Sequence, residues 1–166
     1  AGHFASIFGT VIAGQHPDTG RRYAMVEPQM GGWGATSKRA GQNAMFSTNH
    51  GDTFNCPVEI AEARYGFDVL EKALFFGPRI EGELSGGAGV RISYSLRNSA
   101  VLSVGYSHAN VPVWSVRNGS SGGRNCLRIS RTDGTIDTYH FASDIALGQG
   151  DVVEIETAFG GSRQAP

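Results

Sequence analysis

The sequence predicts a mainly β fold of the α+β kind, with glycine-rich antiparallel sheets and one short helix near residues 57–65. Two observations predict it: apolar residues recur at a period of two in short runs, and 24 of the 166 residues are glycine, about twice the usual share. Hydrophobic residues make up 40% of the chain and charged residues only 17%, which favours a packed core over a disordered tail or a coiled coil. We expect residues 1–166 to form a single β-rich unit, because the length suits one domain.

Eight short runs of β-forming residues, separated by Gly, Asn or Asp, are the expected strands. In the VVEIE run at 152–156 the glutamates alternate with apolar residues, as in a strand with one wet face. The Asp133-Gly134 pair predicts a tight hairpin that joins residues 126–131 to residues 135–141. The expected strands are residues 23–27, 69–76, 90–96, 101–106, 111–116, 126–129, 136–141 and 152–157.

One segment, PVEIAEARYG at residues 57–66, is expected to be helical. Asn55 can cap its start, Pro57 suits its first turn, and Gly66 can end it. Elsewhere no internal repeat recurs at a fixed period, and no Pro-rich or Gly/Ser stretch is long enough to separate two domains.

Charge and hydropathy exclude several classes of partner. Fourteen Lys and Arg nearly balance fifteen Asp and Glu, so we expect neither a nucleic acid nor a membrane as partner. No apolar stretch approaches the length of a membrane span, and the first residues do not resemble a signal peptide, so we expect a cytoplasmic protein. Cys56 and Cys126 lack the spacing of a zinc site or a disulfide framework and are expected to be buried free thiols.

Three glycine clusters, at residues 31–34, 86–89 and 120–123, raise the question of a phosphate-binding loop. None is followed by a helix pattern or by the Lys-Ser/Thr pair of a Walker loop, so we interpret them as tight turns and expect no nucleotide on this chain. Residues 119–123 also match the GxSxG nucleophile pattern, which requires a helix after the serine. Strand patterns flank them on both sides, and a Gly/Ser hairpin loop is the better interpretation.

The densest chemistry lies in the sequence STNHGDTFNCPVEIAE at residues 47–62. In an extended chain His50 and Asp52 share a face, as a metal-ligand pair or an orienting imidazole–carboxylate couple requires. Glu59 and Glu62, three apart, can share a helix face. The alternative is purely structural: a turn at 51–52, a cap from Asp52 or Asn55, and glutamates that favour the start of a helix.

A metal site would need at least one further ligand. The remaining histidines are scattered without a spacing that nominates one, so no metal and no cofactor is assigned to this chain alone. They are His3, His16, His108 and His140.

Two sequence blocks resemble those of a known family. The first is GGWGA at 31–35 and the second is HGDTFNCPVE at 50–59. They are similar to the GGWGA and G(D/N)TYNxPVE blocks of the hydantoinase B/oxoprolinase family. This family comprises the B-type subunits of ATP-dependent hydantoinases and 5-oxoprolinases, with relatives in acetone and acetophenone carboxylases. The likeness covers the C-terminal third of such a subunit. It continues, in family order, at Glu62 and at residues 65–66, 85–90, 112–114 and 147–157.

The sequence also departs from the family pattern at two places. Ser85 stands where the family has an arginine before two glycines, and residues 159–163 replace a GGGGYG-like tail.

The resemblance implies a multi-subunit enzyme that acts on a cyclic amide or a ketone. An A-type subunit uses ATP and magnesium to phosphorylate the substrate, and the B-type subunit processes the phosphorylated intermediate by hydrolysis or carboxylation. It further implies a hetero-oligomer with that A-type subunit and the N-terminal part of the B-type subunit, and a divalent metal held elsewhere in the complex.

Within this hypothesis His50, Asp52 and Asn55 are the first candidate site residues, as orienting or polar-contact groups, followed by Glu59 and Glu62. Two alternatives remain open. The chain could be a non-catalytic structural or assembly module, or a free-standing β-sandwich or barrel that binds a small molecule.

Overall fold

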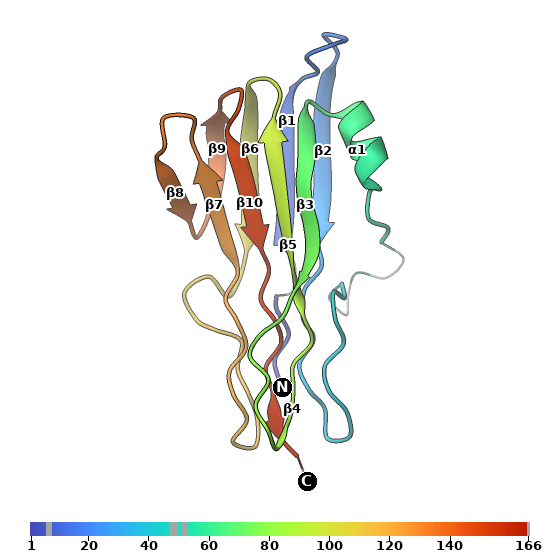
Figure 1. The fold of residues 1–166 in the computed structure, drawn as a ribbon, viewed down its shortest axis with the longest axis vertical. Coiled ribbons are helices and arrows are strands. Elements are labelled where there is room, and N and C mark those ends of the chain that lie inside the picture. Colours follow the sequence, from blue (N-terminus) through green and yellow to red (C-terminus); the bar gives the residue numbers. More distant parts are fainter. Residues whose placement is uncertain (6–7, 47–49, 51–52, 166) are drawn as a thin grey trace.

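A computed structural model describes residues 1–5, 8–46, 50 and 53–165 of the chain. The described residues form two antiparallel sheets packed face to face, so the mainly β prediction is confirmed (Figure 1). One sheet has the order β2-β1-β6-β9, built from β1 (Phe8–Gln15), β2 (Arg22–Gln29), β6 (Ala100–Tyr106) and β9 (Ala142–Leu147). The other has the order β3-β5-β10-β7-β8, built from β3 (Phe67–Phe75), β5 (Gly89–Leu96), β10 (Val152–Glu156), β7 (Cys126–Ser130) and β8 (Ile136–Tyr139).

Alternation along the strands puts the core between the two sheets. Ile12 and Leu102 point inward from one sheet and Ile92 and Ile155 from the other, and all four side chains are completely buried. These residues belong to one continuous apolar cluster. Because the period is two, the opposite faces of the strands are left for polar and charged side chains.

Seven of the eight expected strand runs lie in strands, and the hairpin at Asp133-Gly134 is confirmed. β7 pairs antiparallel with β8, and Gly134 takes the positive φ of 88° that a tight turn requires. The strand expected at residues 111–116 is wrong. Its backbone bonds go to separate segments, since Val113 exchanges bonds with residues 122–123 while the carbonyl of Trp114 accepts from Gly2, so no ladder forms.

The helix α1 (Val58–Arg64) lies close to the predicted bounds, but its predicted cap is wrong. Pro57 occupies the N-cap position, and no side chain of a described residue caps the helix. Asn55 instead turns its amide nitrogen toward the sulfur of Met30. The helix ends at Tyr65, whose extended backbone leads directly into β3.

Below the sandwich, extended segments from distant parts of the chain run side by side (Figure 1). They are joined by backbone hydrogen bonds; for example, the N–H of Gly32 donates to Ala158, that of Gly87 to Trp33, and that of Gly160 to Gly87. We call this region the glycine bundle. It comprises residues 1–5, 31–35, 41–46, 85–89, 111–114, 119–123 and 158–162, with the short pair β4 (Glu83–Leu84) and β11 (Arg163–Gln164) at its end.

The interpretation of the three glycine clusters as tight turns is wrong, because their glycines serve close packing. Positive φ values occur at Gly20, Gly82, Gly134 and Gly150, and at no glycine of the clusters. A Cβ on Gly32 would lie 2.0 Å from the carbonyl oxygen of Gly87. Only glycine allows backbones to approach this closely.

Residues 119–123 form one arm of a hairpin that turns at Arg117 and Asn118, whose φ values are 51° and 60°. The expected hairpin is present, but its turn lies at residues 117–118 and not at 119–123; no helix follows Ser121 as a nucleophile elbow would need. In the part of the chain that the structure describes, no helix is long and apolar enough to cross a membrane.

Candidate functional site

The segment expected to carry the chemistry connects the glycine bundle to α1. His50 is half-buried and forms no hydrogen bond or ion pair with a described residue. Asp52 lies outside the described residues, so its pairing with His50 stays a prediction. Glu59 is exposed on the first turn of α1, whereas the carboxylate of Glu62 accepts the backbone N–H of Val69 at 2.8 Å and ties the helix to β3.

Asn55 is the predicted residue that contacts the neighbourhood of the 31–35 block. Its Nδ2 donates to the sulfur of Met30 at 3.1 Å, and its Oδ1 is buried without a hydrogen-bond partner among the described residues. A buried carbonyl oxygen without a donor is costly, which marks this atom as a place where a ligand or water can bind. Met30 directly precedes the 31–35 block, so Asn55 lies beside it.

The 31–35 block also contacts the chain that leads toward the 50–59 block. The indole Nε1 of Trp33 donates to the carbonyl of Phe46 at 2.8 Å, and Gly31 exchanges backbone bonds with Met45. The 31–35 block therefore holds the chain just before the 50–59 block, and Asn55 returns to the same place.

Sequence reasoning missed a polar cluster beneath this segment, in which every residue but Lys72 is buried. We define the polar cluster as Glu27, Gln29, Lys72 and Tyr94, which come from β2, β3 and β5. Glu27 accepts from the Tyr94 hydroxyl at 3.1 Å and from the Cys56 N–H at 3.3 Å, and Lys72 lies 3.7 Å from its carboxylate. The signal was present, because the period of two puts Glu27 on the same face of β2 as the buried Met25.

The electrostatics of the polar cluster keep Tyr94 protonated. Burial, together with the nearby Glu27 carboxylate, raises the pKa of Tyr94 far above its ordinary value. Tyr94 therefore remains a hydrogen-bond donor to Glu27 at any physiological pH. The amide of Gln29, only 1% exposed, has no hydrogen-bond partner on either of its polar atoms among the described residues.

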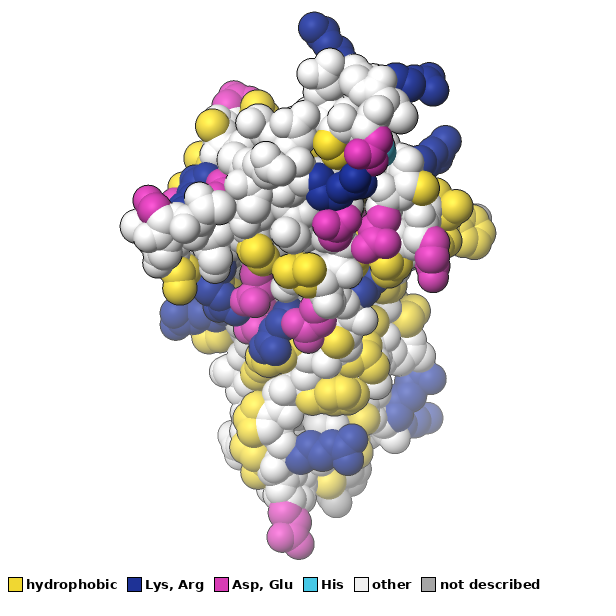
Figure 2. Space-filling model, turned by 45° about the horizontal axis from the view of Figure 1, so that its top comes forward, with side chains coloured by type: hydrophobic (Ala, Val, Ile, Leu, Met, Phe, Trp, Pro, Cys, Tyr) yellow, Lys and Arg dark blue, Asp and Glu magenta, His cyan; other side chains and the backbone are white. Residues whose placement is uncertain are grey.

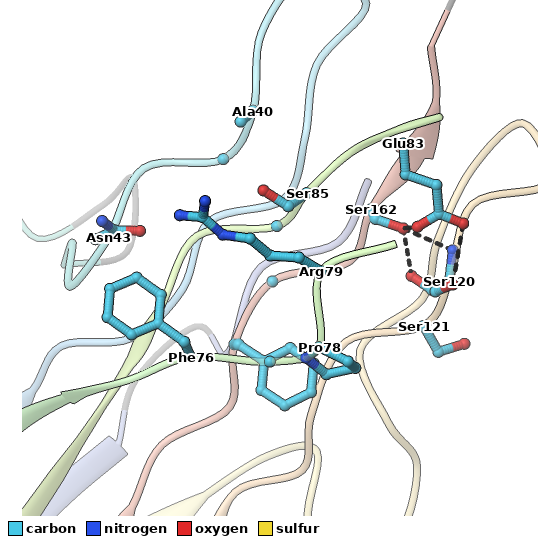
Figure 3. A pocket seen from close by; sticks show the side chains of 15 residues that line it. Ala40, Asn43, Phe76, Pro78, Arg79, Glu83, Ser85, Ser120, Ser121 and Ser162 are labelled. Atoms are coloured by element: carbon cyan, nitrogen blue, oxygen red, sulfur yellow. Dashed lines mark hydrogen bonds between the residues drawn. The ribbon is translucent and has the colours of Figure 1, made fainter. Parts of the chain in front are cut away.

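A cavity of about 190 Å³ opens at the far end of the glycine bundle (Figure 3). Glu83 accepts hydrogen bonds from the hydroxyls of Ser162 and Ser120 there. The Ser162 hydroxyl, more than any other group, lowers the pKa of Glu83, so this carboxylate stays ionised and is a poor proton acceptor. The Arg79 side chain extends away from Glu83, toward the side that Asn43 and Ser85 line. The cavity is suited to polar contact rather than acid–base chemistry.

The two cysteines are the remaining candidates for reactive side chains. Cys56 and Cys126 are free but each is partly exposed, so the expectation of buried thiols is wrong. Burial raises the pKa of the Cys126 thiol, which keeps it protonated and unreactive at neutral pH.

Within residues 1–5, 8–46, 50 and 53–165, no three His, Cys, Asp or Glu side chains come together as metal ligands.

A family model described as Hydantoinase B/oxoprolinase matches residues 1–162. The chain belongs to this family. The resemblance drawn from the two motif blocks is therefore confirmed, and both blocks lie within the matched range. No curated protein sequence matches the chain.

Among solved structures, the ATP-dependent caprolactamase from Pseudomonas jessenii is similar to this hydantoinase B/oxoprolinase family member, with a TM-score of 0.71 over 97% of the chain. The sequence identity is 18%, and at that level the likeness shows a shared fold. The chain spans 29% of the length of the caprolactamase chain.

Proposed function

We propose that this chain forms part of the B-type subunit of an ATP-dependent enzyme complex that hydrolyses a cyclic amide. The family match over residues 1–162 is the observation that carries the proposal. The caprolactamase neighbour supports the choice of a cyclic amide, since its fold covers 97% of this chain. The remaining part of the B-type subunit and an A-type subunit complete the complex.

The chemistry divides between the subunits. The A-type subunit binds ATP with magnesium and phosphorylates the amide oxygen, which turns a poor leaving group into a good one. The B-type subunit then holds the phosphorylated intermediate while water adds to the former carbonyl carbon and the ring C–N bond breaks, with the nitrogen leaving as a protonated amine. The acyl phosphate that remains reacts with a second water to give the carboxylate and free phosphate. The described residues do not form a metal site, so none of these steps is assigned to a metal bound by them.

We assign His50, Asp52 and Asn55 to contact or orient the intermediate. The hydrogen bond of Asn55 to Met30, which adjoins the 31–35 block, and the Oδ1 of Asn55, which has no partner among the described residues, support this assignment. Glu59, which is exposed, is a candidate for contact with the rest of the complex. Glu62 is better described as a positioning residue, because its carboxylate holds the start of β3.

The proposal is tested in the full-length B-type subunit assembled with its A-type partner. Ala substitution at His50 and Asn substitution at Asp52 are expected to lower ATP-coupled ring opening by about a hundredfold or more, as loss of a proton-transfer or orienting group does. The matched control is His140→Ala, at an exposed histidine beyond the end of β8, which should leave turnover unchanged. Full turnover in the His50→Ala and Asp52→Asn complexes would remove the assignment.

A second candidate function, that of an assembly module, is favoured by exposed apolar side chains on and after the edge strand β3. Leu70 is 60% exposed, Leu74 47% and Phe76 53%. If assembly is the whole function, Leu70→Ser and Leu74→Ser will dissociate the complex while His50→Ala leaves turnover intact. Assays with a ketone and bicarbonate, in place of the cyclic amide, separate carboxylation from hydrolysis.

A further inference from the structure

The β1–β2 hairpin and the end of α1 enclose a second pocket, of about 520 Å³, at the opposite end of the molecule from the glycine bundle. Its volume lies within the usual range for small-molecule sites. Three arginines line it, Arg21 and Arg22 from the hairpin and Arg64 from the last turn of α1, with His16 beside them. We call it the arginine pocket. Figure 2 shows Lys and Arg side chains projecting from this end of the molecule.

The positive charge of the arginine pocket is uncompensated. No Asp or Glu lines it, and Arg21, Arg22 and Arg64 form no side-chain hydrogen bond or ion pair with a described residue. By contrast, Arg91, Arg128 and Arg131, on the other sheet, each pair with carboxylates. The three arginines are exposed, and positive side chains that share one pocket without a counter-charge attract a small anion.

Asp18, a nearby carboxylate, does not compensate the positive charge of the arginine pocket. Asp18 lies 4.0 Å from Nδ1 of His16, but it is exposed and forms an ion pair with Arg97 at 2.6 Å. Its charge is thus already matched by an arginine that does not line the pocket.

His16 gives the pocket a buried donor. The backbone N–H of Asp18 donates to its Nδ1 at 3.2 Å, so in the neutral imidazole the proton is on Nε2. His16 is only 7% exposed, and its Nε2 has no hydrogen-bond partner among the described residues. His16 lines the same pocket as the three exposed arginines, and a polyoxygen anion can accept from unpaired donors of both kinds.

We infer that the arginine pocket binds the phosphoryl group of a small molecule. Planar guanidinium groups match the oxygens of phosphate, and the Nε2–H of His16 supplies a further donor. The rings of Tyr23 and Tyr65, with centroids 5.7 Å apart, form an aromatic wall that suits an organic group attached to the phosphate. The inference does not depend on the proposed ring-opening activity.

The test titrates inorganic phosphate and phenyl phosphate into the intact protein and follows binding by calorimetry. We expect saturable binding, weakened about tenfold by each of Arg22→Gln and Arg64→Gln, since each removes one charge-assisted contact. The matched control Arg39→Gln changes an exposed arginine outside the pocket and should leave the affinity unchanged.

A further variant, His16→Asn, tests whether phosphate binding requires a specific donor or only a general positive charge. His16→Asn keeps an acceptor for the Asp18 N–H but removes the Nε2 donor, and it should also weaken phosphate binding about tenfold. Circular dichroism verifies that each variant is folded. Tighter binding of phenyl phosphate than of phosphate identifies an organic phosphate as the ligand, and equal binding identifies free phosphate.

Absence of phosphate binding to the wild-type protein, or binding that Arg22→Gln, Arg64→Gln and His16→Asn leave unchanged, overturns the inference. Either result leaves the proposed function intact, because that is measured by ATP-coupled turnover. Conversely, loss of the proposed function in the His50 and Asp52 tests has no bearing on phosphate binding.

Discussion

At the scale of single residues, one buried carboxylate, that of Asp151, is held by several partners at once. Asp151, which is 4% exposed, accepts the N–H of Gly148 at 2.8 Å, that of Thr132 at 3.3 Å and the guanidinium of Arg131 at 2.9 Å. Burial alone would raise the pKa of Asp151, but these donors together hold it below its ordinary value. The carboxylate thereby fixes the turn that leads into β10.

Asp151→Asn is expected to lower the free energy of unfolding at pH 7 by about 1–3 kcal/mol, because it removes charge-assisted hydrogen bonds in a buried site. A depressed pKa in the folded state gives stability that is fully present above the ordinary pKa of Asp, about 3.9, and is lost as the pH falls through the folded value. The difference between the variant and the wild type should therefore shrink below about pH 4.

Urea denaturation at pH 7 and pH 3 measures this difference. Asp144→Asn is the control, since Asp144 is exposed and asparagine also tolerates its positive φ of 55°. It should change stability by no more than about 0.5 kcal/mol. A deficit for Asp151→Asn that is the same at both pH values would contradict the role given to its charge.

At the scale of elements, the chain contains two kinds of extended backbone. The strands of the sandwich pair in ladders and alternate their side chains between core and solvent. The segments of the glycine bundle instead contact several neighbours at once, and glycine removes the side chains that would keep their backbones apart. Gly32 lies against Gly87 and Gly160 in this way, whereas a Cβ on Gly105, in β6, would meet nothing within 4 Å.

Gly32→Ala is expected to destabilise the protein by about 3 kcal/mol or more, because the added methyl group would overlap backbone atoms that cannot move independently. Gly105→Ala, an identical change in an open position, should alter stability by about 0.5 kcal/mol at most. Thermal unfolding of the two variants makes the comparison. Equal effects would mean that close backbone packing does not explain the glycine clusters.

At the scale of the whole molecule, polar side chains tie the two sheets and the bundle together. Glu27 on β2 and Lys72 on β3 link the edge strands of the two sheets, and Tyr94 adds a contact from β5. Asn125 lies where sandwich and bundle meet, donating to the carbonyls of Phe4 and Ser107 and accepting the N–H of Ala158. These contacts fix the position of the bundle relative to the core.

Removing one partner of the Glu27–Lys72 pair should cost more than removing both. Lys72→Met leaves a carboxylate that is 8% exposed without its cation, and we expect a loss of about 1–3 kcal/mol. The double variant Glu27→Gln/Lys72→Met should recover part of that loss, giving a non-additive cycle. Urea denaturation of the four proteins measures the coupling. Strictly additive losses would show that the two sheets are not joined through this pair.

The predictions from sequence succeeded where local patterns decide the structure. The β7–β8 hairpin follows from Asp133-Gly134, and α1 follows from a short run of helix-forming residues between a proline and a glycine. They failed at residues 111–116 and at the glycine clusters, because backbone partners there come from segments far apart in the chain. The polar cluster was missed for the same reason, since Glu27 is satisfied by residues of two other strands.

The sequence by itself determined the β class, most strand positions, the helix and the family, because alternation, turn residues and motif blocks are local properties. Only the tertiary structure decided that glycine serves close packing, that Asn55 reaches Met30 rather than capping α1, and that three arginines share one pocket with a buried histidine donor. Each of these depends on which distant backbones meet. That choice is made by burial and hydrogen bonding over the whole molecule, and no short stretch of sequence contains it.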